Sequence, residues 1–242
     1  MASTLTDPYL KTARAKEHLE ELRERIRVFR ESEPGSVTRQ EDAENGLYIL
    51  RFEIKNLPDK ITLIVGDFLY CLRCSLDQLV WALAKQVGTY PQGTQFPIFR
   101  TPNPGKFSQY TADVPADAVS IIESLQPYHR GDAEAIASHY LWQLSLLCNI
   151  DKHRRIPVES TVIDFRFPEF PRELIPQIRF DHYAKVVIVP LDLKRYMTLD
   201  PVGTIDITFG DSHEGIKCNF ARLEEIYEFV ANSVIPRFSR FF

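Results

Sequence analysis

The sequence predicts an α+β fold, because helix-forming segments come first, strand-forming segments follow and a helix returns at the end. Before residue 155, strong helix formers carry apolar residues spaced three and four apart. After it, β-branched runs alternate with proline-rich turns, a pattern typical of antiparallel strands. Helices and strands are segregated along the chain, which disfavours a doubly wound nucleotide-binding sheet.

Length and composition indicate a single domain over residues 1–242. The chain is 44% hydrophobic and 26% charged, which is ordinary for a globular protein with a substantial core. Its net charge of -4 gives no global attraction to phosphate backbones, so RNA could bind only through a local basic patch. The start lacks a secretory signal and no run reaches the roughly 18 apolar residues of a membrane helix. We therefore expect a cytoplasmic protein without membrane contact.

The first expected helix covers about residues 6–31. Leu19, Leu22, Ile26 and Phe29 form a narrow apolar stripe along it. We expect this stripe to pack on the body of its own domain. The alternative is the seam of a coiled coil.

Two further helices are expected to form an antiparallel central pair. One runs from about 59 to 87, and the other from Ala133 to Asp151 with Asp132 as its N-cap. A short helix is expected from Ala116 to Leu125, and the N-terminal helix and a last helix over 220–241 should pack on the pair. The first central helix carries a stripe of leucines every three or four residues: Leu69, Leu72, Leu76, Leu79 and Leu83.

The strands are expected to form a small antiparallel sheet from the C-terminal half. Tyr48, Leu50 and Phe52 alternate with other residues in one additional short strand, and segment 94–100 reads as extended and on the surface. The strands of the C-terminal half are expected at 156–165, 178–180, 185–190 and 203–209.

The strongest candidate for chemistry is the polar run at the end of the second central helix. His153 is the candidate proton-transfer group, because an imidazole titrates near neutrality, with Arg154 neutralising a phosphate and Asn149 beside it. Asp151 and Lys152 are candidate binding residues. The alternative is structural, because cations near a helix C-terminus interact favourably with the helix dipole by roughly 0.3–1 kcal/mol each.

A second polar pair could join this cluster. Arg73 and Asp77 lie four apart on the first central helix, and Ser145, Asn149 and His153 share a face of the second. A pocket between the helices would bring these groups together. The alternative, which the residues favour, is a buried ion pair that ties the two helices to each other.

Four segments resemble a family of uncharacterised bacterial proteins. They are residues 66–81 (GDFLYCLRCSLDQLVW), 125–128 (LQPY), 149–154 (NIDKHR) and 234–238 (VIPRF). The likeness covers most of the chain, from the first helix to the last. It implies that these segments belong together and supplies no activity.

A second resemblance is to HEPN domains, helical proteins that often act as metal-independent ribonucleases through an arginine and a histidine four to six residues later. In that motif a polar residue usually follows the arginine. Asn149 and His153 match this polar residue and the histidine, but Cys148 stands at the arginine position. The resemblance implies that His153 assists attack of a ribose 2′-hydroxyl on the phosphate. Arg154 or Arg73 would then replace the missing arginine.

No cofactor and no metal are expected. Cys71 and Cys74 form a lone CxxC, and the six histidines include no HExxH pair. We expect a non-catalytic intracellular binding or structural protein, with a homodimer through the long helices as a candidate assembly. The alternative is a HEPN-like ribonuclease or RNA-binding protein centred on His153.

Overall fold

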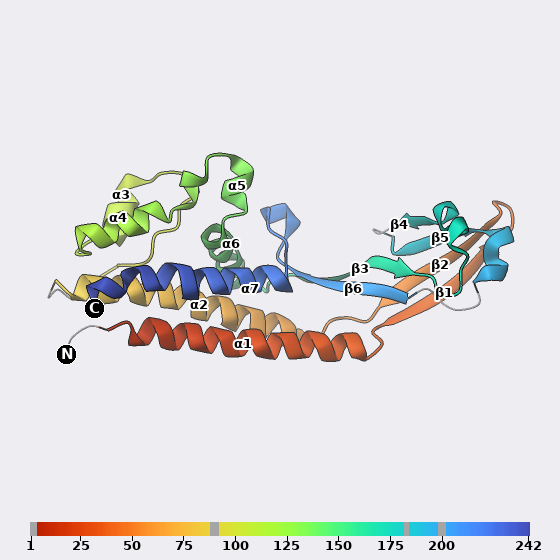
Figure 1. Cartoon of the computed structure of the whole chain (residues 1–242), viewed down its shortest axis with the longest axis horizontal. Coiled ribbons are helices and arrows are strands. Elements are labelled where there is room, and N and C mark those ends of the chain that lie inside the picture. Colours follow the sequence, from red (N-terminus) through yellow and green to blue (C-terminus); the bar gives the residue numbers. More distant parts are fainter. Residues whose placement is uncertain (1–3, 88–91, 182–183, 198–201) are drawn as a thin grey trace. The chain divides into compact units, whose positions relative to one another are not determined.

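The structure is a computed structural model that describes residues 4–87, 92–181, 184–197 and 202–242. It has an α+β fold with antiparallel sheets (Figure 1). The chain separates into two compact units, which we call the helical unit (residues up to Glu24, 59–157 and 209–242) and the sheet unit (25–58 and 158–208). This division does not test whether the chain folds as one domain, so the single-domain expectation stays a prediction.

The α-helices begin and end close to the expected positions at 6–31, 59–87 and 116–125, and elsewhere they differ from the expectation. They are α1 (Thr6–Glu31), α2 (Asp59–Lys85), α3 (Pro104–Tyr110), α4 (Ala116–Ser124), α5 (Ala133–Ala137), α6 (Tyr140–His153) and α7 (Phe220–Glu228). After α7 the chain continues as a π-helical turn, η5 (Phe229–Val234), and a 3₁₀ helix, η6 (Ile235–Phe241). The helix type changes at Ile235, next to Pro236, which has no N–H to donate to a helical hydrogen bond. Short 3₁₀ turns are η1 (Pro127–Arg130), η2 (Arg172–Gln177), η3 (Leu191–Tyr196) and η4 (Ser212–Glu214).

The helical unit is built around α2 and α6. The two helices are antiparallel, because Gly66 lies against Asp151 and Leu69 lies against Cys148. Helix α1 runs antiparallel to α2, and Lys60 of α2 forms an ion pair with its Glu21 at 3.0 Å (Figure 1). Helix η6 also contacts α2. The leucine stripe of α2 is confirmed as core, since each of its members is 0% exposed: Leu69, Leu72, Leu76, Leu79 and Leu83.

The second central helix differs from the expectation because it is broken into α5 and α6. The break is at His139, whose imidazole Nδ1 accepts the backbone N–H of Leu141 at 3.2 Å and caps α6. The side chain of Arg222 donates to the carbonyl of Ser138 on the other side of the break. These contacts satisfy backbone groups that a continuous helix would satisfy internally.

Segment 94–100 forms neither a helix nor a strand and, contrary to expectation, it is not on the surface. Phe96 is 0% exposed and Ile98 is 9% exposed. Helix α3, which was not expected, follows this segment. Asn103 caps this helix, with its side chain accepting the N–H of Lys106, and Pro104 stands at the first position.

The sheet unit contains strands from both halves of the chain, whereas a sheet from the C-terminal half was expected. Strands β1 (Gly35–Asp42), β2 (Leu47–Ile54), β5 (Val186–Pro190) and β4 (Arg179–Asp181) form one antiparallel sheet in that order. Tyr48 and Leu50 lie opposite Val189 and Val187, and all four side chains are buried. The apolar face of β2 thus packs beside that of β5, a strand more than 130 residues later in the sequence. A second sheet has the order β3 (Val158–Arg166), β6 (Val202–Phe209) and β7 (Cys218–Asn219).

Candidate functional site

The helical unit holds a polar cavity of about 210 Å³ beside α2 and α6. We call it the polar site. Its walls also include segment 95–99 and the side chain of Cys148. The polar side chains that line it are Arg73, Asp77, Gln95, Tyr110, Ser145, Asn149 and Lys152.

Helices α2 and α6 contact each other closely beside this site. Buried Cys148 donates its thiol to the carbonyl of Leu69 at 3.5 Å, and burial raises the pKa of this thiol to about 12. Cys148 is therefore a neutral group at physiological pH. Nearby, the carboxylate of Asp151 lies against the backbone of Gly66, whose missing side chain leaves room for it. Burial, with a smaller contribution from Asp67, raises the pKa of Asp151.

Arg73 and Asp77 form an ion pair, but they do not tie α2 to α6. The Arg73 Nη2 donates to Asp77 Oδ1 at 2.8 Å and Nε donates to Oδ2 at 3.2 Å. The same Nη2 donates to the carbonyl of Phe96 at 2.7 Å, and the Phe96 N–H donates to Asp77 at 2.9 Å. The pair thus satisfies both backbone groups of a buried residue, as buried backbone requires. It holds segment 95–99 against α2.

Several donors of the polar site remain unused. The two N–H groups on Nη1 of Arg73 have no acceptor among the described residues, although its other donors are bonded. Within the same described ranges, the Lys152 ammonium, the Asn149 amide and the hydroxyls of Ser145 and Tyr110 also make no hydrogen bond. Two cations against the single carboxylate of the paired Asp77 leave the site with a net positive charge.

The seven candidate residues do not all converge on one site. The structure brings Asn149 and Lys152 to the polar site with Arg73 and Asp77, because residues 145, 149 and 152 follow the helical spacing of one face. His153 is exposed and is not one of the residues that line this site. Asp151 faces α2 instead.

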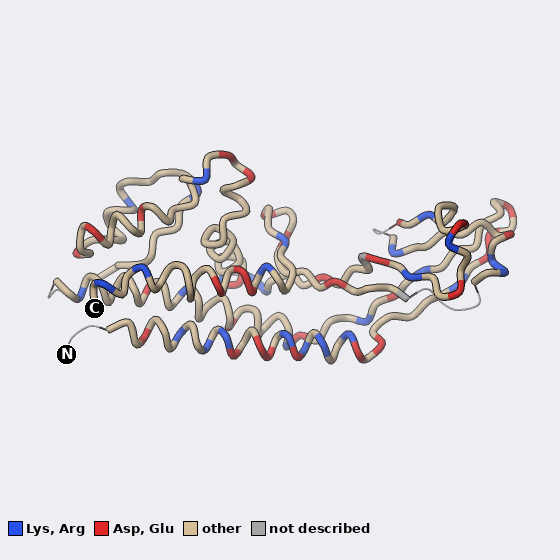
Figure 2. Tube along the Cα trace, in the orientation of Figure 1, with Lys and Arg blue, Asp and Glu red and all other residues tan. Residues whose placement is uncertain are grey.

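The basic residues after Lys152 are occupied by carboxylates. Arg154 forms ion pairs with Asp211 and Glu214, both at 2.9 Å, and Arg155 pairs with Asp59 at 2.6 Å. Basic and acidic residues are also interspersed along α1 (Figure 2). Of the cationic side chains in the run 149–155, Lys152 is therefore the one that lines the polar site.

Tyr110 and segment 95–99 are parts of the site that were not predicted from the sequence. The signal for α3, and so for the position of Tyr110, was the Asn-Pro pair at 103–104, which is typical of a helix start. No sequence signal placed segment 95–99 against α2, since its contacts with Arg73 and Asp77 span 23 and 19 residues, respectively.

Comparisons of the chain with protein-family models, with curated proteins and with solved structures find no match. Both resemblances read from the sequence therefore stay predictions. Across the part of the chain that the structure describes, no group of three or more His, Cys, Asp or Glu side chains is placed to hold a metal ion. Among those residues, no helix has both the length and the apolar character needed to cross a membrane.

Proposed function

We propose that the protein is a non-catalytic binding protein whose polar site holds a small oxyanion, either a phosphate or a carboxylate. The observation that carries this proposal is the convergence of unused donors on one cavity: Lys152, Nη1 of Arg73 and Asn149 all line it. Charge-assisted hydrogen bonds to an anion are roughly twice as strong as neutral ones. The net positive charge of the site favours the same class of ligand.

The size of the cavity supports a small ligand. A volume of about 210 Å³ lies below the roughly 300–1,000 Å³ that is typical of sites for drug-sized molecules. The site therefore suits an inorganic anion or the charged end of a larger molecule. Two charge-assisted contacts of roughly 1.5–3 kcal/mol each predict a Kd on the order of 1 mM.

The proposal is tested by NMR titration of the full chain with inorganic phosphate and, separately, with acetate. We expect saturable shifts at α6 amides, and we expect Lys152→Met to raise the Kd about tenfold, which corresponds to the loss of one charge-assisted contact. Lys16→Met is the matched control, because Lys16 is exposed on α1 and is not among the residues that line the site. Equal Kd values in the two variants would contradict the proposal.

The second candidate is the HEPN-like ribonuclease centred on His153, and one observation favours it. His153 is exposed, as a proton-transfer group must be, and it follows Lys152 of the polar site directly. The support is weaker, because neutral Cys148 occupies the arginine position and Arg154 is bound to two carboxylates. RNA cleavage without added metal, lost in a folded His153→Ala variant, would replace the binding proposal with this one.

We further propose a bacterial and cytoplasmic setting, on the strength of the resemblance and of the free state of all four cysteines. We also propose a homodimer that forms through the long helices. Exposed apolar side chains of α2 support it, namely Leu63, Tyr70 and Trp81. Sedimentation of the full chain, with Tyr70→Lys as the variant expected to dissociate a dimer, tests this assembly.

A further inference from the structure

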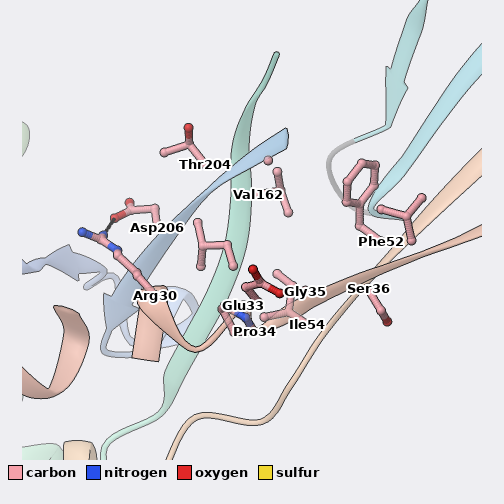
Figure 3. A pocket seen from close by; sticks show the side chains of 13 residues that line it. Arg30, Glu33, Pro34, Gly35, Ser36, Phe52, Ile54, Val162, Thr204 and Asp206 are labelled. Atoms are coloured by element: carbon pink, nitrogen blue, oxygen red, sulfur yellow. Dashed lines mark ion pairs between the residues drawn. The ribbon is translucent and has the colours of Figure 1, made fainter. Parts of the chain in front are cut away.

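The sheet unit contains a much larger cavity, of about 730 Å³, which is distinct from the polar site (Figure 3). Its lining residues come from the end of α1, from the β1–β2 hairpin, and from β3 and β6. A volume of this size lies within the roughly 300–1,000 Å³ typical of small-molecule sites. We call it the sheet cavity.

The body of the sheet cavity is apolar. Phe52 and Val162 are 7% and 3% exposed and also belong to the core of the unit. Gly203 is a necessary part of the wall, because a Cβ there would lie 2.7 Å from Cγ1 of Val162. The other apolar lining side chains are Val37, Ile54 and Ile205. This lining would bind a hydrophobic group of a ligand by removing it from water.

The charged groups of the cavity are Arg30, Asp206 and Glu33. Arg30 and Asp206 form an ion pair at 4.0 Å. The Glu33 carboxylate points into the cavity, apart from that pair (Figure 3), and it makes no hydrogen bond or ion pair with any residue that the structure describes. Lys55 donates to the backbone carbonyl of Glu33 at 3.4 Å rather than to its carboxylate.

Glu33 also has an unusual backbone. Its φ of 48° lies in the left-handed region, which costs a residue with a side chain on the order of 1 kcal/mol or more. A hydrogen bond fixes the backbone directly after Glu33, since the N–H of Lys55 donates to the carbonyl of Pro34 at 2.7 Å. Residues held in such conformations cluster at ligand-binding positions.

We propose that the sheet cavity binds a small organic amine, with the ammonium group at Glu33 and an apolar body against Phe52, Ile54 and Val162. One cation and two carboxylates give the charged lining groups a net negative charge, which complements a cation. A carboxylate ligand would instead add a third negative charge to the same cavity. The ammonium supplies the donors that the Glu33 carboxylate lacks.

The test titrates the full chain with three probes of the same shape: 2-phenylethylamine, 2-phenylethanol and 3-phenylpropionate. In the wild type we expect the amine to bind at least about tenfold tighter than either other probe, as one charge-assisted contact predicts. Glu33→Gln should remove this preference while leaving the affinity for the alcohol unchanged. Glu53→Gln is the matched control, because Glu53 is exposed on β2 and is not a lining residue of this cavity.

A third variant locates the binding. Ile54→Trp fills the cavity and should abolish binding of both the amine and the alcohol, while the phosphate titration of the polar site stays unchanged. The preference for the amine is measured as a ratio of two affinities on one protein, so a fraction of unfolded chain does not alter it. Tighter binding of 3-phenylpropionate than of the amine in the wild type, or no preference between the amine and the alcohol, would overturn the proposal.

Discussion

Gln126 is the side chain whose loss we expect to destabilise the helical unit most for its size. It is 1% exposed, and it lies between the end of α4 and segment 95–99. Its amide nitrogen donates to the carbonyls of Pro97 and Ile122 at 2.8 and 3.1 Å. Its amide oxygen accepts the N–H of Phe99 at 3.1 Å. One side chain therefore satisfies two backbone groups of an extended segment that has no strand partner.

The variant Gln126→Leu keeps the volume of the side chain and removes all three hydrogen bonds. The carbonyl of Ile122 retains the N–H of Leu125 at 3.3 Å, so the groups of Pro97 and Phe99 are the ones left without a partner. Each unsatisfied buried group costs about 1–3 kcal/mol, and the partial exposure of Phe99 places it toward the lower end. We expect a loss of about 3 kcal/mol, a large share of the roughly 5–15 kcal/mol that stabilises a typical domain.

Urea unfolding followed by tryptophan fluorescence measures the loss of unfolding free energy in the helical unit, where Gln126 lies. Both tryptophans, Trp81 and Trp142, lie in the helical unit, so the signal reports its unfolding. Gln109→Leu is the matched control, because Gln109 is exposed on α3, and we expect it to change the free energy of unfolding by less than about 0.5 kcal/mol. A loss below about 1 kcal/mol in Gln126→Leu would refute the reasoning. It would mean that the backbone of segment 95–99 finds other partners.

Three other expectations follow from groups whose environment is unusual. Burial, with smaller effects of two nearby arginines, lowers the pKa of His139 to about 4. Its contribution to stability is therefore present above the unfolded-state pKa near 6.5 and is lost as the pH falls from 6.5 to 4, by up to about 3 kcal/mol. His139→Asn keeps a capping group and should flatten this part of the curve in unfolding measured against pH, whereas an unchanged slope would contradict the assignment. Gly210→Ala should lower the free energy of unfolding by about 2 kcal/mol or more, because φ is +109° and the new Cβ would lie 2.6 Å from a carbonyl oxygen. Gly131→Ala, at φ +93° with nothing within 4 Å, should lose only about 1 kcal/mol in the same assay, and equal losses would refute the steric argument. In a thiol-reagent assay at pH 8, partly exposed Cys74 should react first and Cys148 only on unfolding, and fast reaction of Cys148 would count against its buried, raised-pKa state.

The position of the candidate site was partly predictable from local patterns. Arg73, Asp77, Asn149 and Lys152 were selected because polar groups at helical spacing stand out against apolar stripes, and the structure places all four around one cavity. The same patterns also selected His153 and Arg154, which do not line this cavity. His153 lies at helical spacing from Asn149, but it is the last residue of α6, is exposed and is not among the residues that line the cavity. The carboxylates that bind Arg154 lie 57 and 60 residues away, where no local pattern could reveal them.

The sequence by itself determined the positions of the long helices α1 and α2 and of most strands, together with their apolar faces, but not β1, α3 or the break at His139. The leucines of α2 and the alternating Tyr48, Leu50 and Phe52 show why, because burial follows the 3.6-residue and two-residue periods of the backbone itself. Only the tertiary structure decided that β2 pairs with β5, that segment 95–99 packs against α2, and that Glu33 enters a cavity. These three arrangements depend on contacts between segments that are far apart in the sequence. Such contacts form where apolar surfaces fit together and backbone groups find hydrogen-bond partners, so local sequence patterns do not predict them.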